Sequence, residues 1–265
     1  MIKDRIAILD SGAGGLSILS EVLNNKLCSK CLYFADTKNM PYGTKNLTEL
    51  FKITCTNIEK IISIFNPNII IIGCNTIGST IYKKIKRKFK GILILSVYPN
   101  IKNIHHELLK IKKNNVGCKK VKSAIIATPQ TINAIKNSFI YRIIGKKIVL
   151  CRLPNLAPKI ENNLQNISNI VPYLKRIFDK FKDFNYIYLG CTHYILISDI
   201  ISTICKSAKI EDGVDILISC LQSHLKNSKS QNTSCEIKLF LTKDNESLKR
   251  KYKFLISKLI KNNIW

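Results

Sequence analysis

The chain has 265 residues, of which 46% are hydrophobic, so it is long enough for two modest domains and its composition is not that of a disordered protein. Its formal net charge of +26 suggests a polyanionic partner such as nucleic acid. The lysines, however, are scattered beside Ile and Asn, without interleaved aromatic residues or a recognised binding motif. We therefore interpret the charge as a compositional bias of solvated surfaces and do not expect nucleic acid to be a partner.

The first residues carry charges where a secretory signal peptide needs an apolar stretch, and no apolar run approaches the roughly 18 residues of a membrane span. We therefore expect a cytoplasmic protein that does not enter a membrane and whose ten cysteines are reduced. Cys28 and Cys31 have the spacing of a metal or redox motif, but neither a second pair nor a flanking histidine accompanies them. Four histidines give no credible metal site, so we predict none.

Short runs rich in Ile, Val, Leu and Tyr alternate with longer amphipathic stretches along the whole chain. This alternation is typical of βαβ units with mainly parallel sheets. Strands are predicted over residues 5–10, 31–35, 68–73, 92–97, 122–127, 147–151, 185–190, 208–211 and 236–241. Helices are predicted over residues 15–24, 46–65, 76–88, 100–113, 130–139, 168–182, 195–205, 213–226 and 245–260.

Two of the predicted strands end in the same way, in Gly-Cys followed by two small or polar residues, at Cys74 and Cys191. Their separation (191 − 74 = 117) also lays residues 7–11 on residues 124–128. We therefore predict two similar halves. If such halves face each other, the two thiols lie on opposite sides of one cleft, which is the geometry that a reaction with two equivalent bases requires.

The end of the first half is indicated by a turn at Pro99, and Gly213 follows the last strand of the second half. A helix, a strand and a terminal helix then remain, and we expect them to return to the first half. The predicted fold is therefore α/β, with two similar βαβ domains, mainly parallel sheets, a pseudo-twofold relation and the active site in the cleft between them. The first domain is predicted to comprise residues 1–98 plus 213–265, and the second to comprise residues 99–212.

A glycine-rich turn from Asp10 to Gly15 follows the first predicted strand and opens a helix. Glycines let the backbone approach a ligand, and free amides at a helix start bind anions. The spacing is not that of a dinucleotide fingerprint, and a strand–helix turn with a capping Asp is an equal alternative. Its position at the same sheet edge as Cys74 favours a functional role.

Cys74 and Cys191 each precede a predicted helix, whose amides can lower a thiol pKa and favour the thiolate. Either cysteine alone would be interpreted as an inert core residue, but the repeat argues against that. His193 follows the second cysteine by two residues, where it can touch a substrate or modulate the thiol. Its counterpart in the repeat is Thr76, so we expect Asp10 to act beside Cys74 as a carboxylate that accepts or steers a proton.

At this point the chain resembles the bacterial glutamate racemases of the aspartate/glutamate racemase superfamily. The similarity includes the segments 6–16, 35–37, 41–44 and 74–76 of the first half. It continues through the segments 127–128, 154–161, 189–194 and 240–242. Together these motifs span nearly the whole chain. The family's usual Pro after the second cysteine motif is Ile195 here, and its frequent Cys before Pro154 is Leu153, but neither change touches a reacting group.

The resemblance implies cofactor-independent interconversion of L- and D-glutamate, which supplies D-glutamate for peptidoglycan and so for cell-wall biogenesis and cell shape. It implies that Cys74 and Cys191 are the catalytic acid/base pair, that Asp10 and His193 support them, and that Glu161 supports the histidine. The substrate contacts that it implies are Asp10, Ser11, Tyr42, Gly43, Asn75, Thr76, Thr192 and His193. Racemases of this kind often form homodimers, and the sequence leaves the oligomeric state open.

Two other functions remain open at this stage. One is another racemase of the superfamily, of the aspartate type, although the combination of Asp10-Ser-Gly with Pro41-Tyr-Gly favours glutamate. The other is a basic nucleic-acid-binding protein on a racemase scaffold, since a fold does not fix a function. The intact pair of cysteines argues against the second.

Overall fold

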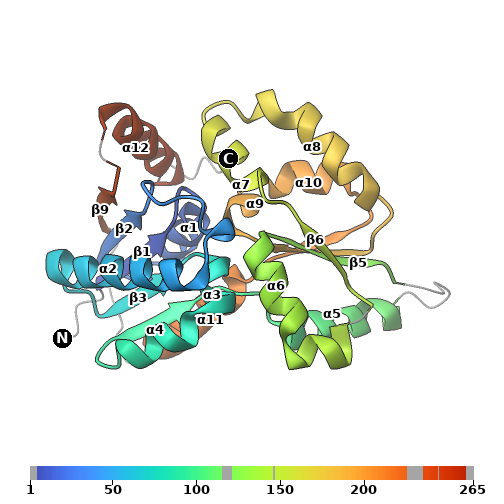
Figure 1. Cartoon of the computed structure of the whole chain (residues 1–265). Helices are drawn as coiled ribbons and strands as arrows, with labels where there is room; N and C mark the ends of the chain where they lie inside the picture. The colour runs from blue at the N-terminus through green and yellow to red at the C-terminus, as the bar shows by residue number, and fades with distance from the viewer. Residues whose placement is uncertain (1–4, 115–120, 146, 226–234, 244, 261–265) are drawn as a thin grey trace.

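The computed structural model describes residues 5–114, 121–145, 147–225, 235–243 and 245–260. Two parallel sheets lie side by side in it (Figure 1). The first sheet has the order β4 (Leu93–Ser96), β3 (Ile69–Ile72), β1 (Arg5–Asp10), β2 (Lys30–Ala35) and β9 (Glu236–Leu241). The second has the order β6 (Val149–Arg152), β5 (Ser123–Ala127), β7 (Tyr186–Gly190) and β8 (Lys209–Glu211). All nine predicted strands are confirmed, and so is the predicted fold class.

The two sheets repeat one another in strand order and in register. The order β4-β3-β1-β2 in the first sheet corresponds to β8-β7-β5-β6 in the second, and only the first continues, with β9. Ile6 of β1 pairs with Ile69 of β3, and Ser123 pairs with Tyr186, so both members of the pair are shifted by the same offset as the two cysteines. The β1–β2 and β5–β6 pairings keep this offset as well, whereas β7–β8 is displaced by one residue from β3–β4.

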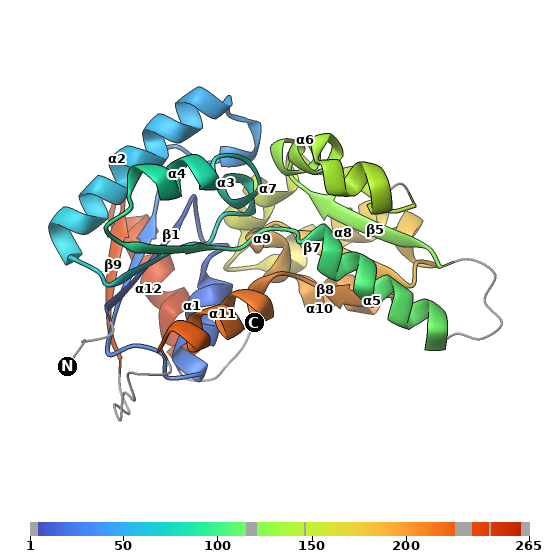
Figure 2. The same cartoon turned by 90° about the horizontal axis from the view of Figure 1, so that it is seen from below.

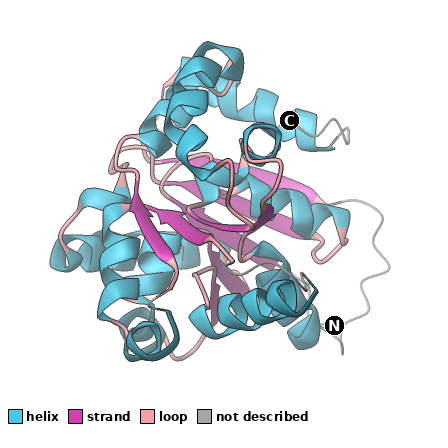
Figure 3. Cartoon of the chain, turned by 90° about the vertical axis from the view of Figure 1, so that its right-hand side faces the viewer, coloured by secondary structure: helices cyan, strands magenta, loops and turns pink. Residues whose placement is uncertain are grey.

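Helices cover both faces of the sheets (Figures 2 and 3). The α-helices are α1 (Leu16–Asn24), α2 (Leu47–Phe65), α3 (Asn75–Thr80), α4 (Tyr82–Lys88), α5 (Ile101–Asn114), α6 (Pro129–Asn137), α7 (Leu156–Asn163), α8 (Val171–Phe178), α9 (Thr192–Ile195), α10 (Ser198–Ile204), α11 (Val214–Leu225) and α12 (Glu246–Ile260). Single turns are η1 (Tyr42–Thr44), η2 (Tyr141–Gly145), η3 (Ile167–Ile170) and η4 (Asp179–Phe181).

Several predicted helices differ from the observed ones. The helix predicted over 76–88 is broken at Ile81 into α3 and α4, that over 195–205 begins earlier as α9 and is interrupted before α10, and that over 168–182 is divided among η3, α8 and η4. Lys226, the predicted last residue of the helix that forms α11, lies outside the described residues.

Helix α7 is absent from the sequence prediction, and its sequence neighbourhood contains Pro154 and Pro158. Pro158 is the third residue of this helix, in the first turn, where its missing N–H has no intrahelical acceptor and is tolerated. The helix that carries Glu161 could therefore form despite the two prolines.

Alternating residues of the buried strands face different helices. In β1, Ile6 and Ile8 belong to the core cluster that includes α1, whereas Ala7 and Leu9 belong to the cluster that includes α2. Strands that are buried on both faces are apolar at every position, which explains the run of four isoleucines in β3. The α1 cluster continues through α7, α8 and α10, so one apolar core connects the two halves.

The C-terminal part of the chain contributes to the first sheet. Strand β9 pairs in parallel with β2, and α11 and α12 both contact α1. The predicted domain boundaries at 98/99 and 212/213 stay a prediction, and their terminal segments 1–4 and 261–265 lie outside the described residues. None of the described helices combines the length and the hydropathy needed to cross a bilayer.

Candidate active site

The carboxyl ends of the strands in the two sheets meet at one small cavity. Its volume is about 20 Å³, enough for about one water molecule. Parallel α/β sheets place ligand sites at this edge. Its lining includes ten of the eleven predicted site residues: Asp10, Ser11, Tyr42, Gly43, Cys74, Asn75, Thr76, Cys191, Thr192 and His193. The eleventh, Glu161, hydrogen bonds to His193.

Cys74 follows β3 and directly precedes α3, with a side chain that is almost fully buried. Burial is the largest influence on its thiol and raises its pKa, and the negative charge of Asp10 raises the pKa further. Hydrogen bonds from the amides of Ile77 and Thr76 act in the opposite direction but are weaker. The predicted lowering of this thiol pKa by helix amides is therefore wrong for Cys74, because burial and Asp10 outweigh the amides.

Cys191 occupies the equivalent position, between β7 and α9, with His193 as its neighbour. Burial alone lowers the pKa of His193, but hydrogen bonds to Cys191 and Glu161 outweigh it and raise this pKa to about 10. The Nε2 atom of His193 lies 2.9 Å from Oε2 of Glu161, and both side chains are buried. A buried imidazolium therefore stands beside the second thiol.

Glu161 is held by groups from three other elements. Besides His193, its carboxylate accepts hydrogen bonds from the backbone N–H of Ala13 and from the hydroxyl of Tyr252, each at 2.8 Å. Lys251 of α12 also donates to the Glu161 carbonyl. Burial raises the pKa of Glu161, but these bonds, led by that with His193, outweigh it and lower the pKa below its usual value. Glu161 therefore ties α7 and α9 of the second half to the first.

Asp10 is also bonded across the two halves. The hydroxyl of Thr192 donates to its Oδ2 at 2.9 Å, and the backbone N–H of Ser11 donates to its Oδ1 at 2.6 Å. Burial raises the pKa of Asp10, although the charge of His193 and these two bonds oppose it. Asp10 therefore stands beside Cys74 as His193 stands beside Cys191, and the two thiols have different neighbours.

The glycine-rich turn allows the second half to approach closely. A Cβ atom on Gly14 would lie 2.5 Å from Oγ1 of Thr192 and 2.6 Å from Nδ1 of His193, and one on Gly12 would lie 2.8 Å from Oε2 of Glu161. The free amides of this turn were expected to bind an anion. In the structure, the Ala13 amide binds an anionic group of the protein itself, the Glu161 carboxylate.

The side chain of Asn75 has no hydrogen-bond partner among the described residues. Both its amide nitrogen and its amide oxygen are buried, and the residue lines the cavity. An unpaired buried amide costs roughly 1–3 kcal/mol, so this position calls for a ligand. Its neighbour Thr76 instead bonds to Thr128, at 3.0 Å between the two hydroxyl oxygens.

Tyr42 lines the cavity, but its hydroxyl points elsewhere. It donates to Asp36 at 2.5 Å and accepts from Asn57 at 3.1 Å. The hydroxyl is therefore committed to the protein. The adjacent Gly43 fits closely against Thr128, since a Cβ atom there would lie 2.6 Å from Cβ of Thr128.

Sequence reasoning did not include Thr128 in the site, although the structure places it in the lining. The repeat contained the signal, because the offset that relates the cysteines lays Ser11 on Thr128. Met40, Pro41, Pro154 and Ala157 also line the cavity. All but Met40 lie in the segments that carry the family resemblance, but none was assigned to the site. Within the described part of the chain, no three His, Cys, Asp or Glu side chains are grouped in a way that could hold a metal ion.

Known proteins resemble this chain over most of its length. A glutamate racemase from Campylobacter curvus is 32% identical over 226 residues, which cover 83% of each sequence. One from Clostridium novyi is 31% identical over 252 residues, which cover 92% of this chain and 93% of the relative. The structure of Escherichia coli glutamate racemase in complex with L-glutamate and the activator UDP-MurNAc-Ala matches with a TM-score of 0.75, over 96% of this chain and 94% of that chain, at 18% identity. No family model matches the chain.

Proposed function

The chain belongs to the glutamate racemase family, and we propose that it interconverts L- and D-glutamate with Cys74 and Cys191 as the two acid/base groups. The single observation that carries this proposal is the pair of thiols at equivalent strand ends, which line one cavity from the two halves. The substrate is a small molecule, and the pair of buried thiols fits proton transfer on two faces of one carbon.

The reaction needs a base on one face of the α-carbon and an acid on the other. One cysteine, as thiolate, removes the α-proton, and the other, as thiol, donates its proton to the opposite face. The total number of protons is unchanged, and the protonation states of the two cysteines are exchanged at the end of the turnover. The two cysteines swap these roles with the handedness of the substrate, so each is the base for one enantiomer and the acid for the other.

The neighbouring groups have separate proposed roles. His193, held by Glu161, stands beside Cys191, and Asp10 stands beside Cys74. The side chain of Asn75 provides a donor and an acceptor that have no protein partner in the described residues, and we assign both to the substrate. The remaining contacts are assigned to Ser11, Gly43, Thr76 and Thr192, with Tyr42 contributing through atoms other than its hydroxyl.

The cavity volume implies that the site opens to admit its substrate. A volume of about 20 Å³ holds about one water, and glutamate is several times larger. We propose that the two halves separate and then close over the substrate, which excludes water from the charged groups. Small-angle scattering with and without D-glutamate tests this, and identical profiles count against it.

A circular-dichroism assay with each glutamate enantiomer tests the activity. We expect racemisation of both and loss of it in Cys74→Ser and in Cys191→Ser, because each variant lacks one of the two proton-transfer groups. Full turnover by either variant would contradict the two-base mechanism. Chiral analysis of the products from L-glutamate and L-aspartate in parallel decides between the proposed function and an aspartate-type racemase.

The cellular role that we propose is the supply of D-glutamate for peptidoglycan in the cytoplasm. Rescue of a D-glutamate auxotroph by the wild-type gene, and not by Cys191→Ser, is the expected result. Failure of an active enzyme to rescue growth contradicts this role and leaves the activity intact. A homodimer stays a proposal from the family resemblance, and sedimentation of the purified protein tests it.

A further inference from the structure

Strand β6 lies at the edge of the second sheet, where the first sheet has one strand more. In the first sheet, β9 pairs in parallel with the outer edge of β2, from Lys30–Glu236 to Ala35–Leu241. The strand equivalent to β2 is β6, and no strand in the described ranges pairs with its outer edge. The repeat therefore leaves the position equivalent to β9 open in the second half.

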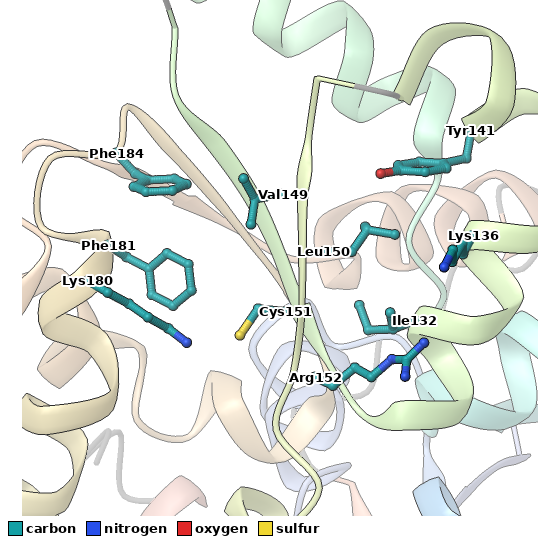
Figure 4. A pocket seen from close by; sticks show the side chains of 10 residues that line it. All are labelled: Ile132, Lys136, Tyr141, Val149, Leu150, Cys151, Arg152, Lys180, Phe181 and Phe184. Carbon is teal, nitrogen blue, oxygen red and sulfur yellow. The ribbon is translucent and has the colours of Figure 1, made fainter.

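The outer edge of β6 lies in a groove with two walls (Figure 4). Its volume is about 620 Å³, more than that of the candidate active site. Phe181, Phe184 and Lys180, from η4 and the loop after it, lie on one side of the strand, and Ile132, Lys136 and Tyr141, from α6 and η2, lie on the other. Strands of one sheet are about 4.8 Å apart, so an added strand would lie in the groove that borders this edge.

The side chains of β6 divide between the two walls. Val149 and Cys151 point toward the phenylalanines, whereas Leu150 and Arg152 point toward α6 (Figure 4). Val149 is 48% exposed although it lies in a strand. An added strand would alternate in the same way, with neighbouring side chains on opposite walls.

The groove is apolar near the start of β6 and cationic near its end. Near the start, Phe184 and Val149 lie on one side of the strand and Tyr141 lies on the other (Figure 4). Lys180 interacts with Cys151 near the end, and Arg152, whose guanidinium donates to Asn133 at 2.8 Å, is the last residue of the strand.

The cations of the groove lack acidic partners. Lys136, Arg152 and Lys180 form no ion pair with a carboxylate in the described part of the chain. Phe139 and Ile143, which flank Tyr141 in sequence, are 76% and 62% exposed, so an apolar surface extends beyond the groove. Both features complement a partner that carries apolar and acidic residues.

We propose that β6 is a docking edge for an acidic extended segment of a partner protein, which adds as a fifth parallel strand in the position equivalent to β9. Main-chain hydrogen bonds to the edge supply affinity, and the walls supply selectivity. Because the strands are parallel, the segment carries its apolar residues before its acidic ones. The formal net charge of +26 disfavours a second copy of this chain as the occupant and favours an acidic partner.

A fluorescent peptide with the sequence Ser-Val-Ile-Glu-Glu-Val-Ser tests this inference with the full-length protein. We expect saturable binding with a Kd of roughly 10–100 µM, and slower hydrogen exchange at residues 149–152 but not at 236–241. The same peptide in reverse order, and one with N-methylated alternate backbone amides, should each bind about tenfold more weakly.

Matched variants distinguish peptide binding in the groove from non-specific attraction to the positively charged surface. Arg152→Glu with Lys180→Glu should weaken peptide binding about tenfold, whereas Lys83→Glu with Lys84→Glu, on the exposed surface of α4, should leave it unchanged. Both double variants should racemise glutamate at the wild-type rate, since neither pair of substitutions touches the active site.

Four outcomes overturn the proposal. The first is the absence of binding at millimolar peptide and low salt. The second is equal weakening by the α4 control, which indicates diffuse charge alone, and the third is equal affinity for the N-methylated peptide, which excludes strand addition. A concentration-dependent dimer that protects residues 149–152 from exchange identifies a second copy as the occupant and likewise contradicts the acidic partner.

Discussion

Glu161 and His193 form a buried pair in which Oε2 lies 2.9 Å from Nε2, with side chains exposed by only 9% and 2%. The pair connects α7 to α9, next to Cys191, and the Ala13 amide connects it to the turn after β1. This pair is therefore one link between the second thiol and the first half of the molecule, beside the bond from Thr192 to Asp10. Removal of the Glu161 carboxylate leaves the buried His193 ring without this charged partner.

Glu161→Gln should therefore reduce kcat by roughly 10–100-fold and shift the pH profile. Without the carboxylate, the pKa of His193 falls from its raised value, so activity should decline at a lower pH than in the wild type. Measurement of kcat from pH 6 to pH 10 tests this. A profile parallel to that of the wild type contradicts a role of Glu161 through His193.

The same pair predicts how stability depends on pH. The pKa of His193 is raised from 6.5 to about 10 in the folded state, so its contribution is fully present below pH 6.5 and is lost as the pH rises through 10. The loss is on the order of a few kcal/mol. Urea unfolding at pH 6, 8 and 10 should show this decrease in the wild type and a much smaller one in Glu161→Gln. Equal decreases in both proteins contradict it.

Asp10→Asn should lower the pKa of Cys74, because the carboxylate charge of Asp10 is, after burial, the largest cause that raises it. The ultraviolet absorbance of the thiolate, titrated in a Cys191→Ser background, reports on Cys74 against the remaining thiols. The titration of Cys74→Ser/Cys191→Ser gives the background to subtract. An unchanged titration after Asp10→Asn shows that the two groups are not coupled.

Gly14→Ala should prevent the two halves from closing, since its Cβ would lie 2.5 Å from Oγ1 of Thr192. We expect a decrease of about 100-fold or more in kcat/KM, with the far-ultraviolet circular dichroism of the wild type. Gly91→Ala is the matched control, because no atom lies within 4 Å of the position of its Cβ. Wild-type activity in Gly14→Ala would mean that close approach at this turn is dispensable.

Asn75→Ala should separate stability from function. Its amide has no partner in the described residues, so its removal should leave Tm unchanged or raise it. Loss of a substrate contact should raise KM by roughly 10–100-fold. Thr54→Ala, which removes a buried hydroxyl bonded to the Leu50 carbonyl, should show the reverse, with lower Tm and unchanged KM. A lower Tm with unchanged KM in Asn75→Ala contradicts the substrate contact.

The strands and most of the residues that line the cavity could be predicted from the sequence, because both depend on local patterns. The apolar runs of β1, β3, β5 and β7 end at the residues that line the cavity, and the repeat of Cys74 at Cys191 indicates that the two ends face each other. Parallel strands bring such ends to one sheet edge, so a linear pattern was enough to place these residues.

The sequence does not reveal the links that depend on the packing of distant elements. The bond from Tyr252 to Glu161 joins α12 to α7, and no local pattern relates the two residues. The raised pKa of Cys74 depends on how deeply the folded chain buries the thiol beside Asp10, whereas the sequence shows only the helix that follows. Helix α7 was not predicted. Two prolines in and before this segment disfavour a helix, although Pro158 is tolerated in its first turn.

Isotope incorporation during racemisation in D₂O tests the two-base mechanism most directly. With L-glutamate as substrate, the D-glutamate formed early should carry deuterium at the α-carbon, while the remaining L-glutamate retains protium, because removal and return of the proton occur on different faces by different cysteines. Early D-glutamate that retains the α-protium, or equally rapid deuteration of both enantiomers, would contradict the assignment of Cys74 and Cys191 as separate bases.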